Sequence, residues 1–334
     1  MNRRAKAATE PSWSVLDLSE AIHVGHSLLT LERLGILESL KKPIALGKLA
    51  TDHNVDAAVL EAALRMLENR TQLIQCRAGK YRVTKWFDGN ARFVLLQYAG
   101  AYANNAVGLG RILRDPALAE SFVDREQHAR AFESVGVPNR DMLADLMLEL
   151  GFGTQTLDIG SGTARMLLYL DARCPNFRGW GIDPNPWMCG VARKRISAAG
   201  ASRRITIFEG DSRNLKKIIR AGVAKDVRAL SATGVANEFF SSGIVSAVAW
   251  LSGIKSMFPG RTMFIFDYYS QDGARKGPSS RIVGLHDFIQ VISGQGIPPA
   301  SLAGWKSIYR RAGSKLLRVV EIPNSPSFIH VLKL

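Results

Sequence analysis

A short glycine-containing turn preceded by an acidic residue is the first feature of the sequence that could do chemistry. The segment LDIGSGTAR, residues 157–165, follows an apolar run and holds Asp158, Gly160 and Gly162. Glycines at such a turn let a ligand approach the backbone closely. A dinucleotide site expects a third glycine where Arg165 stands, and a phosphate-binding P-loop expects Gly-Lys-Ser/Thr after the turn. The turn therefore indicates another ligand, and Asp158 favours one with positive charge or hydroxyl groups.

Two further carboxylates stand at equivalent places in the next two strand-like runs. Asp183 ends RGWGID and is followed by Pro184, and Asp211 ends RITIFEGD and is followed by Ser212. Asp183 lies 25 residues after Asp158, where an acidic side chain can accept both hydroxyls of a ribose. At the end of the third run, the carboxylate of Asp211 and the neighbouring backbone can form hydrogen bonds with the edge of an adenine. Three acidic strand ends thus predict a pocket for a positively charged nucleoside.

The second half of the chain supplies the strands that would position these groups. Strand-like and helix-like segments alternate from residue 154 onward. This order predicts an open, mostly parallel α/β sheet of seven strands with helices on both faces. The final runs, KLLRVVEI and SFIHVLKL, predict an antiparallel hairpin. Because ligands of such sheets bind beyond the carboxyl ends of the strands, the three acidic residues should meet there.

The first half reads differently. Residues 15–70 read as short helices, with apolar residues at helical spacing, and QLIQCRAGKYRVTKW reads as a β-hairpin around RAGK. Helices followed by a hairpin suggest a winged helix-turn-helix. The leucines that set the first helical pattern are Leu28, Leu31, Leu34 and Leu37. The expected domains are residues 1–90, a helical linker or substrate lid over residues 91–150, and residues 151–334.

The charge of the chain is strongly basic and unevenly distributed. Of a formal net charge of +15, residues 151–334 carry 25 Lys/Arg and 11 Asp/Glu, which gives +14. Nucleic acid, an anionic small substrate or solubility alone could explain such an excess. The helix that would enter DNA does not suit that role, since it has three carboxylates for one cation: Asp56, Glu61, Glu68 and Arg65. An anionic small molecule is therefore the favoured partner over nucleic acid.

Compartment and membrane association can also be predicted. No apolar run approaches the roughly 20 residues of a membrane span, and no secretory signal is recognisable at the start of the sequence. The three cysteines form no C-x-x-C pair, which argues against a disulfide scaffold or structural zinc. We therefore expect a cytoplasmic protein with no membrane association.

The three strand-end motifs together resemble the class I S-adenosylmethionine-dependent methyltransferases, and the amino-terminal part resembles the winged-helix dimerisation domain of the small-molecule O-methyltransferase group. This resemblance implies a Rossmann-like catalytic domain, S-adenosyl-L-methionine as cofactor and a homodimer. It also implies that Gly160 and Gly162 approach the amino-acid part of the cofactor and that Asp183 holds the ribose. Asp211 and Ser212 would flank the adenine.

The expected catalytic groups differ from those of the plant-like O-methyltransferases. In those enzymes a His-Asp pair follows the fourth strand, and its His is the base. Here the segment GVANEFF places Asn237 and Glu238 at that point, and His286 follows after the fifth strand. The arrangement also resembles the 2-oxo-acid C-methyltransferases, in which two His and a carboxylate hold a metal. The matching set would be Asn237, Glu238 and His286, but Asn offers only a neutral oxygen. We expect no metal, with Glu238 or His286 as the base or as an orienting group.

Further residues are candidates for the substrate site. The aromatic side chains of Tyr268, Tyr269 and Trp305 would form walls of the substrate pocket. Arg281, together with Arg275 and Lys276, could attract a carboxylate or phosphate. His23 and His26 have no further ligand nearby and are expected to pack at the dimer interface.

The leading hypothesis is therefore a methyltransferase acting on the O, N or C atom of a small, anionic specialised metabolite. A metal-assisted C-methyltransferase of a 2-oxo acid, a nucleic-acid methyltransferase and a relative that uses the cofactor for another reaction are the alternatives.

Overall fold

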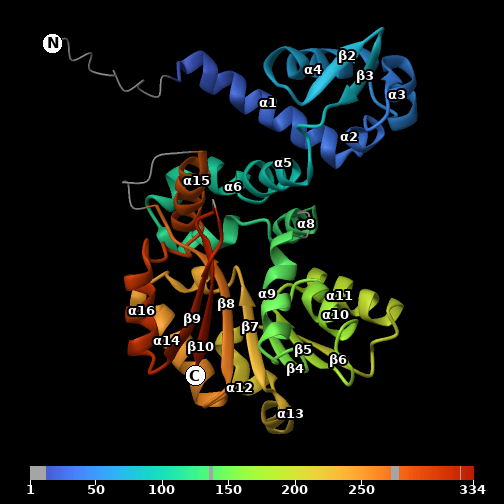
Figure 1. The fold of residues 1–334 in the computed structure, drawn as a ribbon. Helices are drawn as coiled ribbons and strands as arrows, with labels where there is room; N and C mark the ends of the chain where they lie inside the picture. The colour runs from blue at the N-terminus through green and yellow to red at the C-terminus, as the bar shows by residue number, and fades with distance from the viewer. Residues whose placement is uncertain (1–12, 135–137, 272–277, 324) are drawn as a thin grey trace, which may run out of the picture. The chain divides into compact units, whose positions relative to one another are not determined.

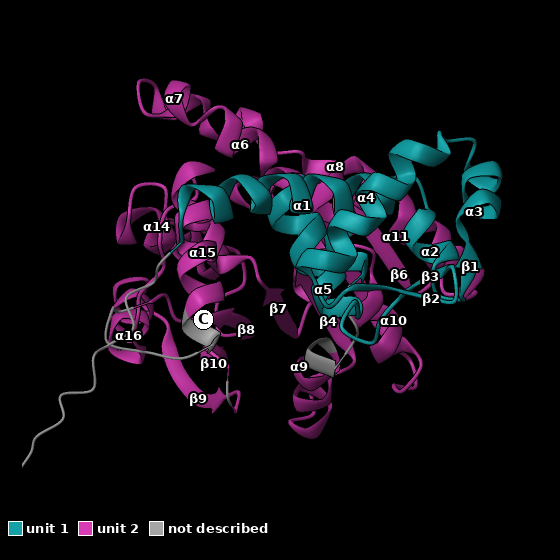
Figure 2. Cartoon of the chain, turned by 90° about the horizontal axis from the view of Figure 1, so that it is seen from above, with its two compact units in different colours: residues 1–100, 131–135 teal, residues 101–130, 136–334 magenta. Residues whose placement is uncertain are grey.

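The computed structural model of the chain describes residues 13–134, 138–271, 278–323 and 325–334. The chain forms two compact units, which Figure 2 shows in different colours. Unit 1 comprises residues 1–100 and 131–135, and unit 2 comprises residues 101–130 and 136–334. The segment 91–150, expected to be a separate linker or lid, is thus divided between the two units.

Unit 1 is built from short helices and a small antiparallel sheet of order β1-β3-β2. The expected hairpin is confirmed: β2 and β3 pair antiparallel, and their turn places Ala78 and Gly79 at φ 50° and 73°. Both φ values suit the turn that matches the twist of a two-residue hairpin. The elements are α1 (Val15–Arg33), α2 (Ile36–Ser39), β1 (Ile44–Ala45), α3 (Leu46–His53), α4 (Ala57–Arg70), β2 (Ile74–Arg77), β3 (Lys80–Val83), α5 (Gly89–Val94) and the π-helix η1 (Leu95–Ala101).

The core of unit 1 follows the predicted leucine pattern with one exception. Leu28, Leu31 and Leu37 are buried, whereas Leu34 is 49% exposed. Leu34 falls outside the pattern because α1 ends at Arg33 and the chain turns through Gly35 at φ 74°. The helical spacing is interrupted there, so Leu34 faces solvent.

Unit 2 contains the expected seven-stranded, mostly parallel sheet, in the order β6-β5-β4-β7-β8-β10-β9. The first five strands of that order pair in parallel, and β10 pairs antiparallel with both β8 and β9, which confirms the predicted final hairpin. The strands are β4 (Gln155–Ile159), β5 (Arg178–Asp183), β6 (Ile205–Glu209), β7 (Ala229–Thr233), β8 (Thr262–Tyr268), β9 (Lys315–Glu321) and β10 (Ser327–Lys333).

Helices cover both faces of this sheet (Figure 1). One face packs against α9, α10 and α11, and the other against α14 and α16, so that two separate apolar clusters sandwich the strands. The helices and short turns are α6 (Ala103–Val107), α7 (Leu109–Ile112), η2 (Pro116–Phe122), α8 (Arg125–Ser134), α9 (Pro138–Glu149), α10 (Arg165–Asp171), α11 (Pro186–Ala198), η3 (Ser212–Asn214), α12 (Leu215–Ile218), α13 (Ala221–Asp226), η4 (Ala236–Phe239), α14 (Ile244–Met257), α15 (Pro278–Ile292) and α16 (Leu302–Arg311).

The carboxyl ends of the parallel strands face α6, α8 and α15 (Figure 1). The buried side-chain amide of Asn105, in α6, donates to the carbonyls of Ala119 and Ile292 at 2.8 and 2.9 Å. These bonds join α6 to η2 and to the end of α15. The helices α6, η2 and α15 are thus bonded to one another at the edge of the sheet where the acidic residues were expected. None of the helices in the described part of the chain is both long and apolar enough to cross a membrane.

Candidate active site

The glycine turn after β4 folds back onto the end of β5. The backbone N–H groups of Gly160 and Ser161 both donate to the carbonyl of Ile182, at 2.8 and 3.1 Å. Gly160 has φ 68°, and a Cβ there would lie 2.3 Å from Cγ2 of Val235. Position 160 therefore requires glycine for its backbone conformation and for the close approach of the segment after β7.

Asp183 connects the turn to the next strand end. Its Oδ2 accepts the N–H of Gly162 and its Oδ1 accepts the N–H of Asn185, both at 2.9 Å. Burial raises the pKa of Asp183, and the two backbone donors oppose that rise. Around Gly162, whose φ is 53°, the one atom within 4 Å of an added Cβ is Cε of Met188, at 3.9 Å. The backbone there leaves space for a ligand beside a carboxylate that can accept hydroxyl groups.

The other two acidic strand ends are partly occupied by protein groups. Asp158 is 4% exposed and accepts the hydroxyl of Ser231 at 2.8 Å. Asp211 accepts the backbone N–H of Arg213 at 2.7 Å and pairs with its guanidinium at 3.0 Å. The Ser212 hydroxyl accepts the indole N–H of Trp250 at 3.0 Å. The strands β4, β5 and β6 are neighbours, so the three carboxylates lie along one edge, as predicted, with Pro184 exposed between them.

Asn237 and Glu238 lie in η4, directly after β7. The backbone N–H of Asn237 donates to Oδ2 of Asp267 at 3.0 Å, and the N–H of Tyr268 donates to Oδ1 at 2.9 Å. Asp267 is 3% exposed, and burial raises its pKa to about 7. The sequence interpretation missed Asp267, although a lone acid inside the apolar strand TMFIFDY was a signal for it. Asp267 fixes the backbone that carries Asn237 and Glu238.

Glu238 is the group best suited to accept a proton near neutral pH. Burial raises its pKa from 4.5 to about 7, while the charges of Arg125 and Arg213 lower it and that of Asp183 raises it. Its side chain is nevertheless only half-buried. A carboxylate that is desolvated yet accessible is well placed to act as a general base.

His286 lies in α15, with its ring edge-on to Tyr268 at 5.0 Å between centroids. The Tyr268 hydroxyl donates to Oδ1 of Asp287 at 3.0 Å, and Oδ2 of Asp287 accepts the N–H of Gln271 at 2.8 Å. Burial lowers the pKa of His286 to about 4, so that the imidazole is neutral at pH 7. A neutral imidazole can accept or donate a hydrogen bond without adding positive charge.

A second histidine, His128 in α8, belongs to the same region and was missed by the sequence interpretation. Its Nδ1 lies 3.3 Å from the Tyr102 hydroxyl. Burial lowers its pKa to about 3, and the charges of Arg125 and His286 act in the same direction. A histidine within the segment expected to cover the substrate was the available signal.

The structure gives the metal-assisted alternative no support. Over the ranges that can be described, no three His, Cys, Asp or Glu side chains approach closely enough to hold a metal ion. The buried Oδ1 of Asn237 has no hydrogen-bond partner, but it is a neutral amide oxygen and a weak ligand.

Two of the expected substrate walls are core residues instead. Tyr269 is 4% exposed, and its hydroxyl donates to Glu321 at 3.0 Å and lies 3.2 Å from Nε2 of His330. Trp305 is 1% exposed and packs edge-on against Phe240. Successive residues of an extended chain point to opposite faces, so Tyr268 faces His286 while Tyr269 faces the core.

The remaining candidates are less well defined. Arg281 is exposed on α15. Arg275 and Lys276 lie outside the described residues.

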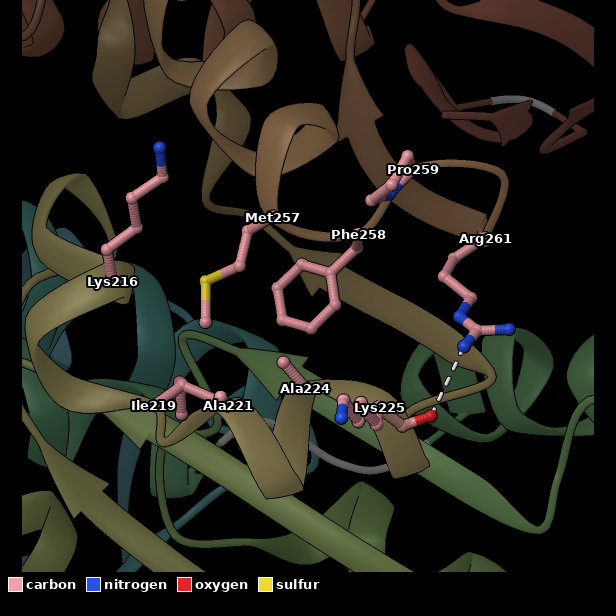
Figure 3. Close-up of a pocket in the computed structure, with 9 residues that line it drawn as sticks. All are labelled: Lys216, Ile219, Ala221, Ala224, Lys225, Met257, Phe258, Pro259 and Arg261. Carbon is pink, nitrogen blue, oxygen red and sulfur yellow. Dashed lines mark hydrogen bonds between the residues drawn. The ribbon is translucent and has the colours of Figure 1, made fainter.

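A surface hollow of about 470 Å³ lies elsewhere, between α12, α13 and the end of α14 (Figure 3). It is lined in part by Lys216, Phe258 and Arg261, and Arg261 donates to the carbonyl of Lys225 at 3.2 Å. These residues precede β7 and β8, at the amino ends of the strands. None of the candidate site residues lines this hollow, so it is separate from the candidate active site.

Comparison with known proteins agrees with this geometry. The family profile described as "Methyltransferase domain" matches residues 156–223, which include Asp158, Asp183 and Asp211. The fold is similar to that of mitomycin 7-O-methyltransferase MmcR, with a TM-score of 0.71, 16% identity and 96% of each chain covered. PigF, solved with SAH, gives a TM-score of 0.72 at 15% identity, covering 97% of this chain and 100% of PigF.

A third similar structure is an N-methyltransferase. It is N,N-8-amino-8-demethyl-D-riboflavin dimethyltransferase (RosA) from Streptomyces davawensis, with a TM-score of 0.60 and 18% identity, covering 96% of this chain and 98% of that one. Residues 156–223 therefore match a methyltransferase domain, and the fold of the chain is similar to that of small-molecule methyltransferases. S-adenosyl-L-methionine is the cofactor of this class.

Proposed function

We propose that the chain transfers a methyl group from S-adenosyl-L-methionine to a small specialised metabolite. The observation that carries this proposal is the hydrogen bond from Gly162 N–H to the Asp183 carboxylate. The backbone of Gly162 leaves space there for a ligand, beside the carboxylate that would bind the ribose. The structures of similar fold act, by their names, on mitomycin and on a riboflavin derivative. They support a small-molecule acceptor and disfavour nucleic acid.

The residues of the chain suggest how the transfer proceeds. Asp183 would hold the ribose, Gly160 and Gly162 the amino-acid part, and Asp211 and Ser212 the adenine. When bound, the cofactor supplies a methyl group activated by its sulfonium. Glu238 takes the proton that the acceptor loses, because its pKa of about 7 lets it bind and release a proton near neutral pH. His286 orients the acceptor as a neutral imidazole.

We further propose that the chain works as a homodimer through α1. The amino-terminal half of this helix exposes several large apolar side chains close together, and a cluster of exposed apolar side chains is typical of a protein interface. They are Val15, Leu16, Leu18 and Ile22, exposed by 81, 65, 51 and 59%. A second copy of the chain would cover them together with the exposed rings of His23 and His26.

Sedimentation of an α1 variant tests the dimer. The double substitution Leu18→Glu and Ile22→Glu should give a monomer at concentrations where the wild-type chain sediments as a dimer. A wild-type chain that is monomeric at tens of micromolar would disprove the proposal.

The charge of the acceptor and the compartment are also proposals. The +14 charge of residues 151–334 supports an anionic acceptor. Free Cys76, Cys174 and Cys189 support a reducing cytoplasm.

Label transfer tests the activity whatever the identity of the acceptor. The purified chain is incubated with methyl-labelled S-adenosyl-L-methionine and a cell extract of its source, which is then separated into molecules below 3 kDa, protein and nucleic acid. The proposal expects label in the small-molecule fraction only. Label confined to nucleic acid or protein, or no transfer at all above a heat-denatured control, would overturn it.

A further inference from the structure

The first turn of α8 is attached to the loop that holds Asp183. The side-chain amide of Asn185 donates to the carbonyl of Arg125 at 2.9 Å, while the backbone N–H of Asn185 donates to Asp183 at 2.9 Å. His128 follows Arg125 by three residues, a rise of about 4.5 Å along the helix. Its position is therefore set by the same loop that would hold the ribose.

Tyr102 fixes the ring of His128. Tyr102 is 1% exposed, and its hydroxyl lies 3.3 Å from Nδ1 of His128, with the two rings at 84° and 5.7 Å apart. The residue before it, Ala101, accepts the N–H of Asp124 at 2.9 Å, which ties this segment to the start of α8. Tyr102 also directly follows the π-helix η1, an element that is frequent at functional sites.

His128 is both surrounded by protein and accessible to solvent. Burial is the main cause of its lowered pKa, and the positive charge of Arg125 lowers the pKa further. Its side chain nevertheless keeps part of its surface exposed. The side chain of Glu238 is likewise partly exposed, and the charge of Arg125 acts on both groups, so His128 and Glu238 lie in the same region of unit 2.

We propose that His128, oriented by Tyr102, is a catalytic residue that donates a hydrogen bond from Nε2–H to the methyl acceptor. Glu238 removes the proton of the acceptor in the same reaction. The inference rests on the proposed function and narrows the acceptor to a hydroxyl group. A phenol donates more readily than it accepts, so Tyr102 donates to Nδ1 and leaves the proton of the neutral ring on Nε2.

The step balances with the groups named. The acceptor loses its proton to Glu238, a bond forms between the acceptor atom and the methyl carbon, and the electron pair of the carbon–sulfur bond stays on sulfur. The acceptor atom must carry a proton for Glu238, a lone pair that attacks the methyl carbon and a second lone pair that accepts from His128. A hydroxyl oxygen meets this requirement, whereas an amine nitrogen has one lone pair and an enolisable carbon has none.

Tyr309 provides a matched control, since its hydroxyl bonds Nδ1 of a second buried histidine, His330, at 2.7 Å in the core. The assay is the rate of label transfer to the extract described above, with binding of S-adenosylhomocysteine measured separately by calorimetry. Tyr102→Phe should lower the transfer rate about tenfold and His128→Gln about 100-fold, the effect of losing one donor at a reacting atom. Both variants should bind S-adenosylhomocysteine like the wild type, and Tyr309→Phe should keep the wild-type rate.

The ring tautomer gives a readout that does not need turnover. Nitrogen-15 spectra of histidine-labelled protein should show His128 with its proton on Nε2, and Tyr102→Phe should mix the tautomers while Tyr309→Phe leaves them unchanged. A proton on Nδ1, or a Tyr102→Phe rate equal to that of Tyr309→Phe, would overturn the inference. If the proposed function fails instead, the wild type itself transfers no label and binds no S-adenosylhomocysteine.

Discussion

Replacing Glu238 by Gln should make the protein more stable at neutral pH while removing its activity. The pKa of Glu238 is raised from 4.5 to about 7, mainly by burial. The charged carboxylate therefore destabilises the folded state, and Gln keeps the shape of the protonated acid without that charge. A gain of stability on removal of a functional group is the expected mark of an active-site residue.

The size and sign of the effect follow from the two pKa values. Between pH 4.5 and 7 the folded protein holds a proton on Glu238 that the unfolded chain has released, so the free energy of unfolding falls as pH rises. Each pKa unit corresponds to about 1.4 kcal/mol, which gives an upper limit on the order of 3 kcal/mol. Since stability is lost as pH rises through 7, the variant should match the wild type near pH 4.5 and exceed it above pH 7.

Urea unfolding followed by tryptophan fluorescence, at pH 5 and pH 8, measures this difference. For a unit of this size about 3 kcal/mol corresponds to roughly 6–12 °C in Tm, which allows a thermal check. Glu149→Gln is the control, since Glu149 is 61% exposed and pairs with Arg318 on the surface. The reasoning is refuted if Glu238→Gln is no more stable than the wild type at pH 8, or if its gain is the same at pH 5.

Three other outcomes are expected. Gly160→Ala should weaken S-adenosylhomocysteine binding at least tenfold and lower Tm, because its Cβ would collide with Val235 at a φ of 68°; unchanged calorimetric affinity would contradict the assigned turn. Asp183→Asn should weaken the same binding about 10- to 100-fold, because the amide cannot accept from Gly162, Asn185 and the ribose together; an affinity within twofold of wild type would count against it. The wild-type rate of label transfer should rise about tenfold from pH 6 to pH 8, as Glu238 ionises around pH 7; a flat profile would exclude Glu238 as the base.

The sheet and the cofactor edge could be predicted from the sequence because both depend on local patterns. Alternating apolar runs define the strands, and parallel strands bring their carboxyl ends together, so Asp158, Asp183 and Asp211 were placed along one edge from spacing alone. The sequence could not show that the Ser231 hydroxyl donates to Asp158 or that the Arg213 guanidinium pairs with Asp211. The Ser231–Asp158 bond joins two strands that only the folded sheet brings together, and the Arg213–Asp211 pair depends on the local turn after β6.

The candidate catalytic residues were harder to predict because His128 and His286 lie on helices that cross the strand ends. His128 lies 158 residues before His286, and no repeat or spacing in the sequence relates the two. Tyr268 and Tyr269 are adjacent, and their opposite environments depend on which face of the strand each one takes. Asp267 acts through backbone N–H groups of Asn237 and Tyr268, which carry no sequence signature.

The central claim is that Asp183 and the glycine turn hold a sulfonium nucleoside at the end of β5. A crystal structure of the protein soaked with S-adenosylhomocysteine measures this directly. The account predicts both ribose hydroxyls within about 3 Å of the Asp183 carboxylate, at hydrogen-bond distance, and the homocysteine sulfur directed toward Glu238 and His128. Clear density for the ligand at another place in unit 2, or none at a saturating concentration, would contradict it.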